Sequence, residues 1–243
     1  MPTTSISITP QFSNNTVTQI NCGTSSPRLS GTIDISAFPN LQAFRCNSND
    51  ITALSGYADN SNLSVVQFFN NKITDSIPNL DLMTNLQDFR CDRNQLTGTI
   101  PSLSGLTNLQ IFQCDRNQLI GTIPSLSGLN NLQEFSCHTN QLTGSIPSLS
   151  GNPLLRSFWC YTNQLTGFDG GSVSNTLGDF QAQSNQLTST AVNAILAAFV
   201  AANRTIGTRI LNLGGIGNAA PTGQGVTDKV SLEDDGWTVT VAP

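Results

Sequence analysis

Cysteine and histidine are the residues of this chain whose type and spacing first suggest chemistry. The sequence contains six cysteines and one histidine, His138. Five cysteines share one setting, two residues after a phenylalanine and three before an asparagine: Cys46, Cys91, Cys114, Cys137 and Cys160. A cysteine at such a repeated position can be a nucleophile, a metal ligand, half of a disulfide or a small buried filler.

The spacing argues against catalysis and against metal binding. Cys137 directly precedes His138, and adjacent residues of a strand point to opposite faces, so the two cannot act as a nucleophile and its base. No CxxC spacing exists for zinc. The glycine-rich stretch 214–217 lacks the lysine of a phosphate-binding loop. We therefore predict no catalytic residue, no metal and no cofactor.

The regular position of the cysteines favours a structural role. A residue at one fixed inward site behaves as a small apolar filler, and free cysteine is among the most buried residue types. We expect all six thiols to be reduced. Stacked parallel strands would place neighbouring cysteines roughly 5 Å apart between Cα atoms, so disulfides stay within reach, although parallel strands do not offer the usual side-chain directions.

The composition narrows the class of partner. Only 10% of the 243 residues are charged, the net charge is −5 and the isoelectric point is near 4.6, which argues against a nucleic-acid partner. No apolar run reaches the roughly 18 residues of a membrane span, so no membrane insertion is expected. The first 22 residues lack the basic and apolar regions of a secretory leader, so the chain stays where it is made, leaves within an assembly, or has been processed.

The asparagines that follow the cysteines reveal a repeat. They recur at steps of 22 or 23 residues: Asn49, Asn71, Asn94, Asn117, Asn140, Asn163 and Asn185. Such a period is typical of a solenoid, in which each coil buries its apolar side against its neighbours. Within one coil, Phe89 and Cys91 face inward, while Arg90 and Asp92 face solvent. The asparagine amide is expected to satisfy backbone groups where the chain turns.

These residues resemble the leucine-rich repeat family, and the pattern LTGxIPxLSGLxNLQ is similar to its plant-type subclass. The match covers about residues 41–188 in seven in-phase copies. The resemblance implies an α/β-solenoid of the leucine-rich repeat type, with a parallel concave sheet, an irregular or 3-10 convex side, and binding through exposed strand positions. Extracellular plant members carry disulfide-closed caps, and no such cysteine pair is evident here.

The two ends are expected to cap the repeats. Residues 1–40 should form an N-terminal cap with one degenerate coil, in which Ile20 and Cys22 belong to a strand. Residues 189–243 should form a C-terminal cap, with a helix to about Asn203, a strand at 209–213, a helix within 225–235 and a strand at 237–241. The ending is similar to tails that follow such repeats in bacterial and bacteriophage proteins.

The outward strand positions supply the candidate ligand-binding residues of the concave face. They are Phe69, Arg90, Asp92, Asp115, Arg116, His138, Trp159 and Tyr161. The arginines and aspartates interleave, and the plain alternative is a mutually screened charge ladder. His138, Trp159 and Tyr161, here called the aromatic patch, suit a contact hot spot. The plain alternative is shielding of the sheet or a contact between subunits.

A non-enzymatic binding or assembly protein is the function that these patterns favour. Near-identical units, the N-terminus without a leader, free thiols and the tail indicate a bacteriophage virion-associated protein, a tail adhesin or capsid decoration on the virion surface. Its concave face would contact a host glycan, or a protein such as another virion subunit. The alternative is a secreted microbial surface-adhesion or ice-binding repeat protein, extracellular or on the cell surface, although Ile120 interrupts the single threonine row.

Overall fold

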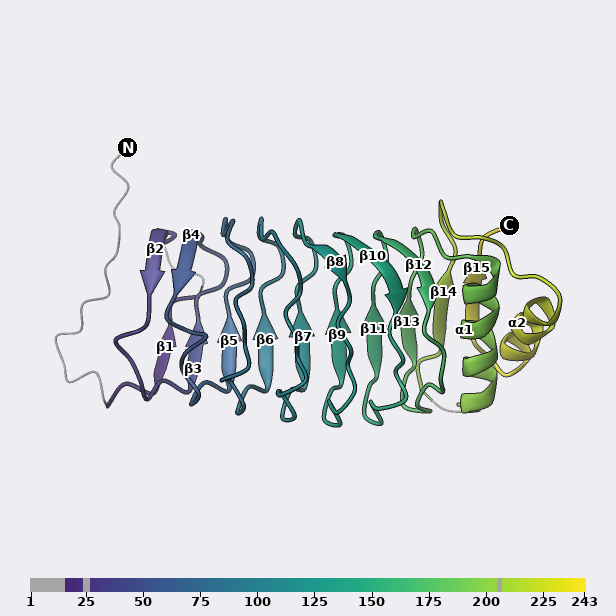
Figure 1. Cartoon of the computed structure of the whole chain (residues 1–243), viewed down its shortest axis with the longest axis horizontal. Coiled ribbons are helices and arrows are strands. Elements are labelled where there is room, and N and C mark those ends of the chain that lie inside the picture. Colours follow the sequence, from purple (N-terminus) through teal and green to yellow (C-terminus); the bar gives the residue numbers. More distant parts are fainter. Residues whose placement is uncertain (1–15, 24–26, 205–206) are drawn as a thin grey trace.

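The protein is an elongated stack of coils closed at one end by two helices (Figure 1). The structure is a computed structural model that describes residues 16–23, 27–204 and 207–243. The chain advances coil by coil from the N-terminal end to the helices (Figure 1). Its shape follows from the period, because each coil covers the apolar edge of the next.

One face of the stack is a ten-stranded parallel sheet. Its strands are, in spatial order, β1 (Gln19–Asn21), β3 (Ala43–Arg45), β5 (Val65–Gln67), β6 (Asp88–Arg90), β7 (Ile111–Gln113), β9 (Glu134–Ser136), β11 (Ser157–Trp159), β13 (Asp179–Gln181), β14 (Ile210–Leu213) and β15 (Thr238–Val241). The repeat sets the register, so that Phe89 lies opposite Phe112 and Phe112 opposite Phe135. The predicted solenoid with a parallel sheet is confirmed.

A column of phenylalanines forms the centre of the core. Phe89, Phe112, Phe135, Phe158 and Phe180 are fully buried, and consecutive rings stack with centroids 5.4 or 5.5 Å apart and planes within 14°. Parallel strands in register hold equivalent side chains one strand spacing apart, which brings these rings into contact. Leucines from the turns and the back of each coil fill the rest of the interior.

The cysteine column lies beside the phenylalanines, and its first pair corrects the prediction of six free thiols. Cys22 and Cys46 form a disulfide across neighbouring coils, with a Cα–Cα distance of 4.7 Å. Four cysteines are free and buried: Cys91, Cys114, Cys137 and Cys160. Phe68 occupies the column between the two groups. Parallel neighbours therefore can be bridged here, and the cysteine pair that the sequence analysis did not find joins the first coil to the second.

The asparagine ladder connects each coil to the one before it. Asn94 shows the pattern: its Oδ1 accepts from the Ile73 N–H at 3.1 Å, and its Nδ2 donates to the carbonyls of Phe68 at 3.0 Å and Cys91 at 3.1 Å. Asn218 continues the ladder into the C-terminal cap, beyond the seven predicted members. The amides thus satisfy backbone groups that the turn leaves unpaired.

Two small parallel sheets follow the asparagine turn on another side of the coils, and they were not predicted. One consists of β2 (Ser30–Asp34) and β4 (Asp50–Ser55), the other of β8 (Ile120–Thr122), β10 (Gln141–Ile146) and β12 (Gln164–Phe168). The first threonine of several coils donates its hydroxyl to a carbonyl of the preceding coil, as Thr143 does to Gly121 at 3.3 Å. These side chains therefore also tie coils together.

Helix α1 (Ser189–Ala202) and helix α2 (Gln224–Asp234) close the C-terminal end. Thr188 caps α1 by accepting from the Ala191 N–H at 3.2 Å. Phe199 of α1 packs edge-to-face on Phe180 at 5.4 Å and on Trp237 at 5.1 Å, so the helix continues the aromatic column. Neither of these helices is long and apolar enough to span a membrane.

Candidate binding surface

The outward side chains of the ten-stranded sheet form a continuous surface, here called the sheet face. The aromatic patch lies on it across two neighbouring coils, that of β9 and that of β11. Tyr161 stacks flat on His138, with ring centroids 4.0 Å apart and planes 9° apart. Trp159 precedes Tyr161 by two residues and is half-buried. The structure thus brings His138 and Tyr161 into direct contact, which their sequence spacing of 23 residues permits because the coils are in register.

His138 and Asp115 are buried, whereas the sequence analysis expected exposed positions. His138 is 6% exposed and Asp115 is 7% exposed. The Nε2 of His138 lies 3.2 Å from Oδ2 of Asp115, and the Ser136 hydroxyl donates to Oδ1 of Asp115 at 2.9 Å. Outward side chains on parallel strands lie only about 4.8 Å apart, so a large ring covers a shorter neighbour. His138 and Asp115 therefore act mainly by holding Tyr161 in place.

The geometry around His138 does not assemble a nucleophile. The thiol of Cys137 points into the core and is fully buried. The Ser136 hydroxyl bonds to Asp115 instead of His138, and Nδ1 of His138 lies 3.0 Å from the Thr139 hydroxyl. Within residues 16–23, 27–204 and 207–243, no group of histidine, cysteine and carboxylate side chains could hold a metal ion.

Asp92 lies next to Asp115 in the same column of the sheet face. Burial, followed by the charge of Asp115, raises the pKa of Asp92 to about 6. Arg93 offsets this only in part, because its Nε is 3.8 Å from Oδ2 of Asp92. Arg90 bonds instead to Asp88, at 2.8 Å. The carboxylate of Asp92 is thus held in a poorly solvated place with little compensation.

Arg116 joins the aromatic patch, although the sequence placed it in the charge ladder. It occupies the turn position before Asn117, where φ is +53° and the side chain is exposed. Burial raises the pKa of Tyr161, while the nearby Arg116 guanidinium opposes that shift. Phe69 does not join the patch, because the coils of Asp92 and Asp115 lie between Phe69 and His138.

Two buried polar atoms in and beside the aromatic patch have no hydrogen-bond partner among the residues that the structure describes. They are the indole Nε1 of Trp159 and Oε1 of Gln183, which follows Tyr161 in its column. Such groups are rare in folded proteins, and each one costs free energy unless a ligand or water satisfies it. This part of the sheet face therefore contains one buried donor and one buried acceptor whose hydrogen bonds are not satisfied by the described residues.

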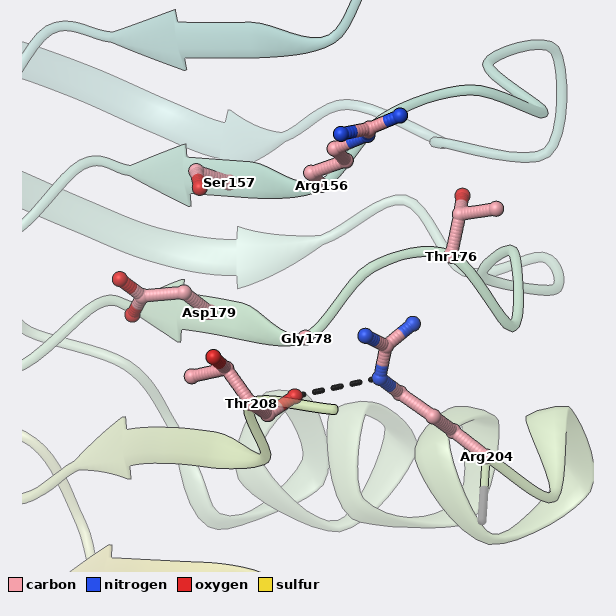
Figure 2. Close-up of a pocket in the computed structure, with 7 residues that line it drawn as sticks. All are labelled: Arg156, Ser157, Thr176, Gly178, Asp179, Arg204 and Thr208. Carbon is pink, nitrogen blue, oxygen red and sulfur yellow. Dashed lines mark hydrogen bonds between the residues drawn. The ribbon is translucent and has the colours of Figure 1, made fainter. Parts of the chain in front are cut away.

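A pocket that the sequence pattern did not predict lies at the start of strands β11 and β13. It has a volume of about 350 Å³ and is lined by Arg156, Ser157, Thr176, Gly178, Asp179, Arg204 and Thr208 (Figure 2). A signal was present, since Gln87, Gln110 and Gln133 precede their strands, whereas the next two coils have Arg156 and Gly178 there. The opening also depends on Arg204 and Thr208, which follow α1 and belong to no repeat.

Comparisons with solved structures show which known proteins have a similar fold. No family model matches the sequence, and no curated protein matches it. Among solved structures, the chain is similar to the plant peptide hormone receptor RGFR1 in complex with RGF2, at 27% identity and a TM-score of 0.63, over 77% of this chain and 32% of that chain. The similarity to the PEPR1–AtPEP1 structure has 23% identity and a TM-score of 0.71, over 93% and 34%.

A bacterial structure shows the same architecture. The functional domain of InlJ from Listeria monocytogenes, which includes a cysteine ladder, has 22% identity and a TM-score of 0.54, over 81% of this chain and 44% of that chain. The structural neighbours are leucine-rich repeat ectodomains and internalins. The chain spans about a third of the length of the two receptor chains.

Proposed function

We propose that this protein is a non-enzymatic binding protein that engages a protein partner through the aromatic patch and Arg116. The observation that carries the proposal is the stacking of Tyr161 on His138, which is itself held by Asp115. A ring fixed in this way loses little conformational entropy on binding, and tyrosine, tryptophan and arginine dominate contact hot spots.

The extent of the sheet face supports a partner of macromolecular size. Its predicted repeats place seven neighbouring strands about 4.8 Å apart, which gives a length of roughly 29 Å. A standard protein interface needs about 800 Å² per partner, which a face of this length accommodates. A solved structure of the same fold adds support, because RGFR1 is a plant peptide hormone receptor in complex with RGF2.

More specifically, we propose that the protein is located on a bacteriophage virion, as a tail adhesin or a capsid decoration. Its support is the C-terminal tail, which is similar to tails of bacterial and bacteriophage repeat proteins, and the near-identity of adjacent coils. In this setting the partner is another virion subunit or a host surface, including its glycans. Mass spectrometry of purified virions and of the culture supernatant tests the location, since enrichment in the supernatant alone contradicts it.

A pair of double variants tests the contact surface. Trp159→Ala with Tyr161→Ala removes the aromatic surface and is expected to abolish attachment to virions or host cells in a sedimentation assay. Gln95→Ala with Gln118→Ala is the matched control, because both glutamines are exposed and follow the asparagine turn, away from the sheet face. Equal attachment of both double variants, with unchanged circular dichroism, refutes the aromatic patch as the contact.

The second candidate is a secreted surface or ice-binding protein, favoured by the sheet of β8, β10 and β12 with its exposed threonines. Two observations weigh against a water-ordering array. Ile120 is 49% exposed within it, and Thr143 and Thr166 direct their hydroxyls to backbone carbonyls. Thermal hysteresis together with shaped ice crystals supports this candidate, and freezing that is indistinguishable from albumin excludes the ice-binding form.

A further inference from the structure

A break in one column of side chains creates a polar opening beside the sheet face. Gln110, Gln133, Arg156, Gly178 and Arg209 occupy equivalent places, one residue before successive strands. Gly178 has no side chain, and the Thr208 carbonyl and the Arg204 guanidinium occupy the place that a side chain would take.

Arg204 approaches Gly178 from a different element. Figure 2 shows Arg156 at the start of β11 and Arg204 after α1, with Thr176 and Gly178 between them on the coil that leads into β13. A Cβ atom on Gly178 would lie 2.2 Å from the Thr208 carbonyl oxygen and 2.9 Å from Nη2 of Arg204. Glycine is therefore required at this place for the two segments to meet.

Arg204 is held by its protein contacts with one nitrogen left over. Its Nε donates to the Thr208 carbonyl at 3.1 Å (Figure 2), and its Nη1 donates to the Asn175 carbonyl. Nη2 forms no hydrogen bond with the part of the chain that the structure describes. The guanidinium is thus fixed by two bonds and still presents a donor, which is the arrangement that binds oxyanions.

The two arginines of the pocket, Arg156 and Arg204, form no direct ion pair with the part of the chain that the structure describes. Burial, followed by the charge of Arg209, lowers the pKa of Arg204. The chain as a whole carries a charge of −5, so this cationic spot is an exception on an acidic protein. A bound anion would relieve both unfavourable effects.

We propose that this pocket binds a carboxylated sugar unit, with its carboxylate between Arg156 and Arg204. The lining supports this class of ligand, because Ser157 and Thr208 supply hydroxyls and every lining residue except Gly178 has a polar or charged side chain. Asp179 contributes an acceptor for sugar hydroxyls, which a bare anion would not need. The volume of about 350 Å³ lies at the lower end of the roughly 300–1,000 Å³ of small-ligand pockets.

The pocket is separate from the aromatic patch but lies on the same strand. Ser157 and Trp159 are two residues apart on one face of β11, which corresponds to roughly 7 Å. A saccharide chain can thus place one acidic unit in the pocket and another unit against the indole. The site does not depend on the protein partner proposed above, and either can be disproved without the other.

The test uses the full chain labelled with nitrogen-15, so that arginine side-chain signals are observed by NMR. Glucuronate is added in one titration, and glucose, inorganic sulfate and N-acetylglutamate in three others. We expect glucuronate to shift the Arg204 Nε–H signal and to bind at least about ten-fold more tightly than the other three compounds. Ten-fold corresponds to about 1.4 kcal/mol.

Arg156→Gln is the decisive variant, because Gln87, Gln110 and Gln133 already occupy this position in three earlier coils. It is expected to keep the melting temperature and to weaken glucuronate binding by about ten-fold or more, as for loss of a charged hydrogen bond. Lys229→Gln removes the same charge from α2, far from the pocket in sequence, and is expected to leave the affinity unchanged.

Each other outcome overturns the assignment in a specific way. Equal binding of glucuronate and glucose removes the role of the carboxylate, and equal binding of sulfate reduces the site to a simple anion site. Tighter binding of N-acetylglutamate assigns the pocket to an acidic peptide. No shift at Arg204, or no effect of Arg156→Gln on glucuronate binding, disproves the site itself.

Discussion

Single residues on the sheet face are governed by the neighbours that lie one coil away. His138 follows β9 on the sheet face, yet Tyr161 covers it and Asp115 contacts it. Ser136 is likewise outward and only 1% exposed, beside the larger Trp159 of the next strand. A side chain that points outward from the sheet is therefore not necessarily exposed, because neighbouring strands are only about 4.8 Å apart. The same crowding displaces water from Asp92 and raises its pKa.

Asp92 is expected to destabilise the folded protein at neutral pH. Its folded pKa of about 6 is above the ordinary value of 3.8. Its contribution to the free energy of unfolding is therefore most favourable below about pH 3.8 and is lost as the pH rises through about 6. Asp92→Asn should therefore increase the free energy of unfolding at pH 7 by about 1 to 2 kcal/mol, with no gain below pH 4. Urea unfolding across this pH range measures the difference.

Asp234→Asn serves as its control, because this carboxylate is exposed near the end of α2. A change within about 0.5 kcal/mol at every pH is expected there. Destabilisation by Asp92→Asn at pH 7 would mean that the contact with Arg93, at 3.8 Å, outweighs the cost of burial.

Asn117 belongs to the ladder, and its removal should be costly. Its Oδ1 accepts from the Leu96 N–H at 2.9 Å, and its Nδ2 donates to the carbonyls of Cys91 and Cys114 at 3.1 Å. Asn117→Ala leaves these backbone groups unpaired and should reduce the free energy of unfolding by about 2 to 4 kcal/mol. Gln118→Ala, at the exposed next position, should change it by less than about 0.5 kcal/mol. Similar losses for both variants would contradict the ladder.

At the scale of elements, the ends of the solenoid are built differently from its middle. Strand β1 is the edge of the sheet, and the Cys22–Cys46 disulfide attaches its coil to the next one. At the other end, α1 and β15 bury Phe199 and Trp237 instead. Interior coils are covered on both sides and need neither device.

The disulfide and the burial of the other cysteines predict how many thiols react with a labelling reagent. Burial raises the pKa of Cys91, Cys114 and Cys137 well above the ordinary thiol value, so the native protein should not react with Ellman's reagent at neutral pH. In denaturant, four thiols should react without a reductant and six after reduction. Reaction of six without a reductant would show that Cys22 and Cys46 are not joined.

The whole molecule is a one-dimensional stack in which each coil contacts only its neighbours. Stability is then close to a sum of coil and interface contributions, and equivalent coils are interchangeable. The phenylalanine column shows this interchangeability, because the Phe89–Phe112 and Phe112–Phe135 pairs have centroid distances of 5.4 and 5.5 Å and nearly equal ring angles.

Removal of one complete coil should therefore leave a folded protein. Deletion of residues 94–116 joins Arg93 directly to Asn117 and brings Phe89 next to Phe135. We expect an unchanged circular dichroism spectrum and cooperative urea unfolding, with an m-value reduced by about a tenth because less surface is buried. Deletion of residues 94–105 removes about half a coil and should give a protein without cooperative unfolding. Loss of folding in the first deletion would contradict the nearest-neighbour description.

The sequence by itself determined the period, the inward columns of phenylalanine and cysteine, and the role of the asparagines, because each coil must bury the same kinds of side chains to stack. The tertiary structure alone decided the Cys22–Cys46 bond, the burial of His138, and the pocket at Gly178. The physical reason is that these three features depend on contacts between side chains one coil apart, and on where the C-terminal helix meets the last strands. A repeat pattern specifies which residues face outward, but their size and charge relative to the neighbouring coil decide what they form.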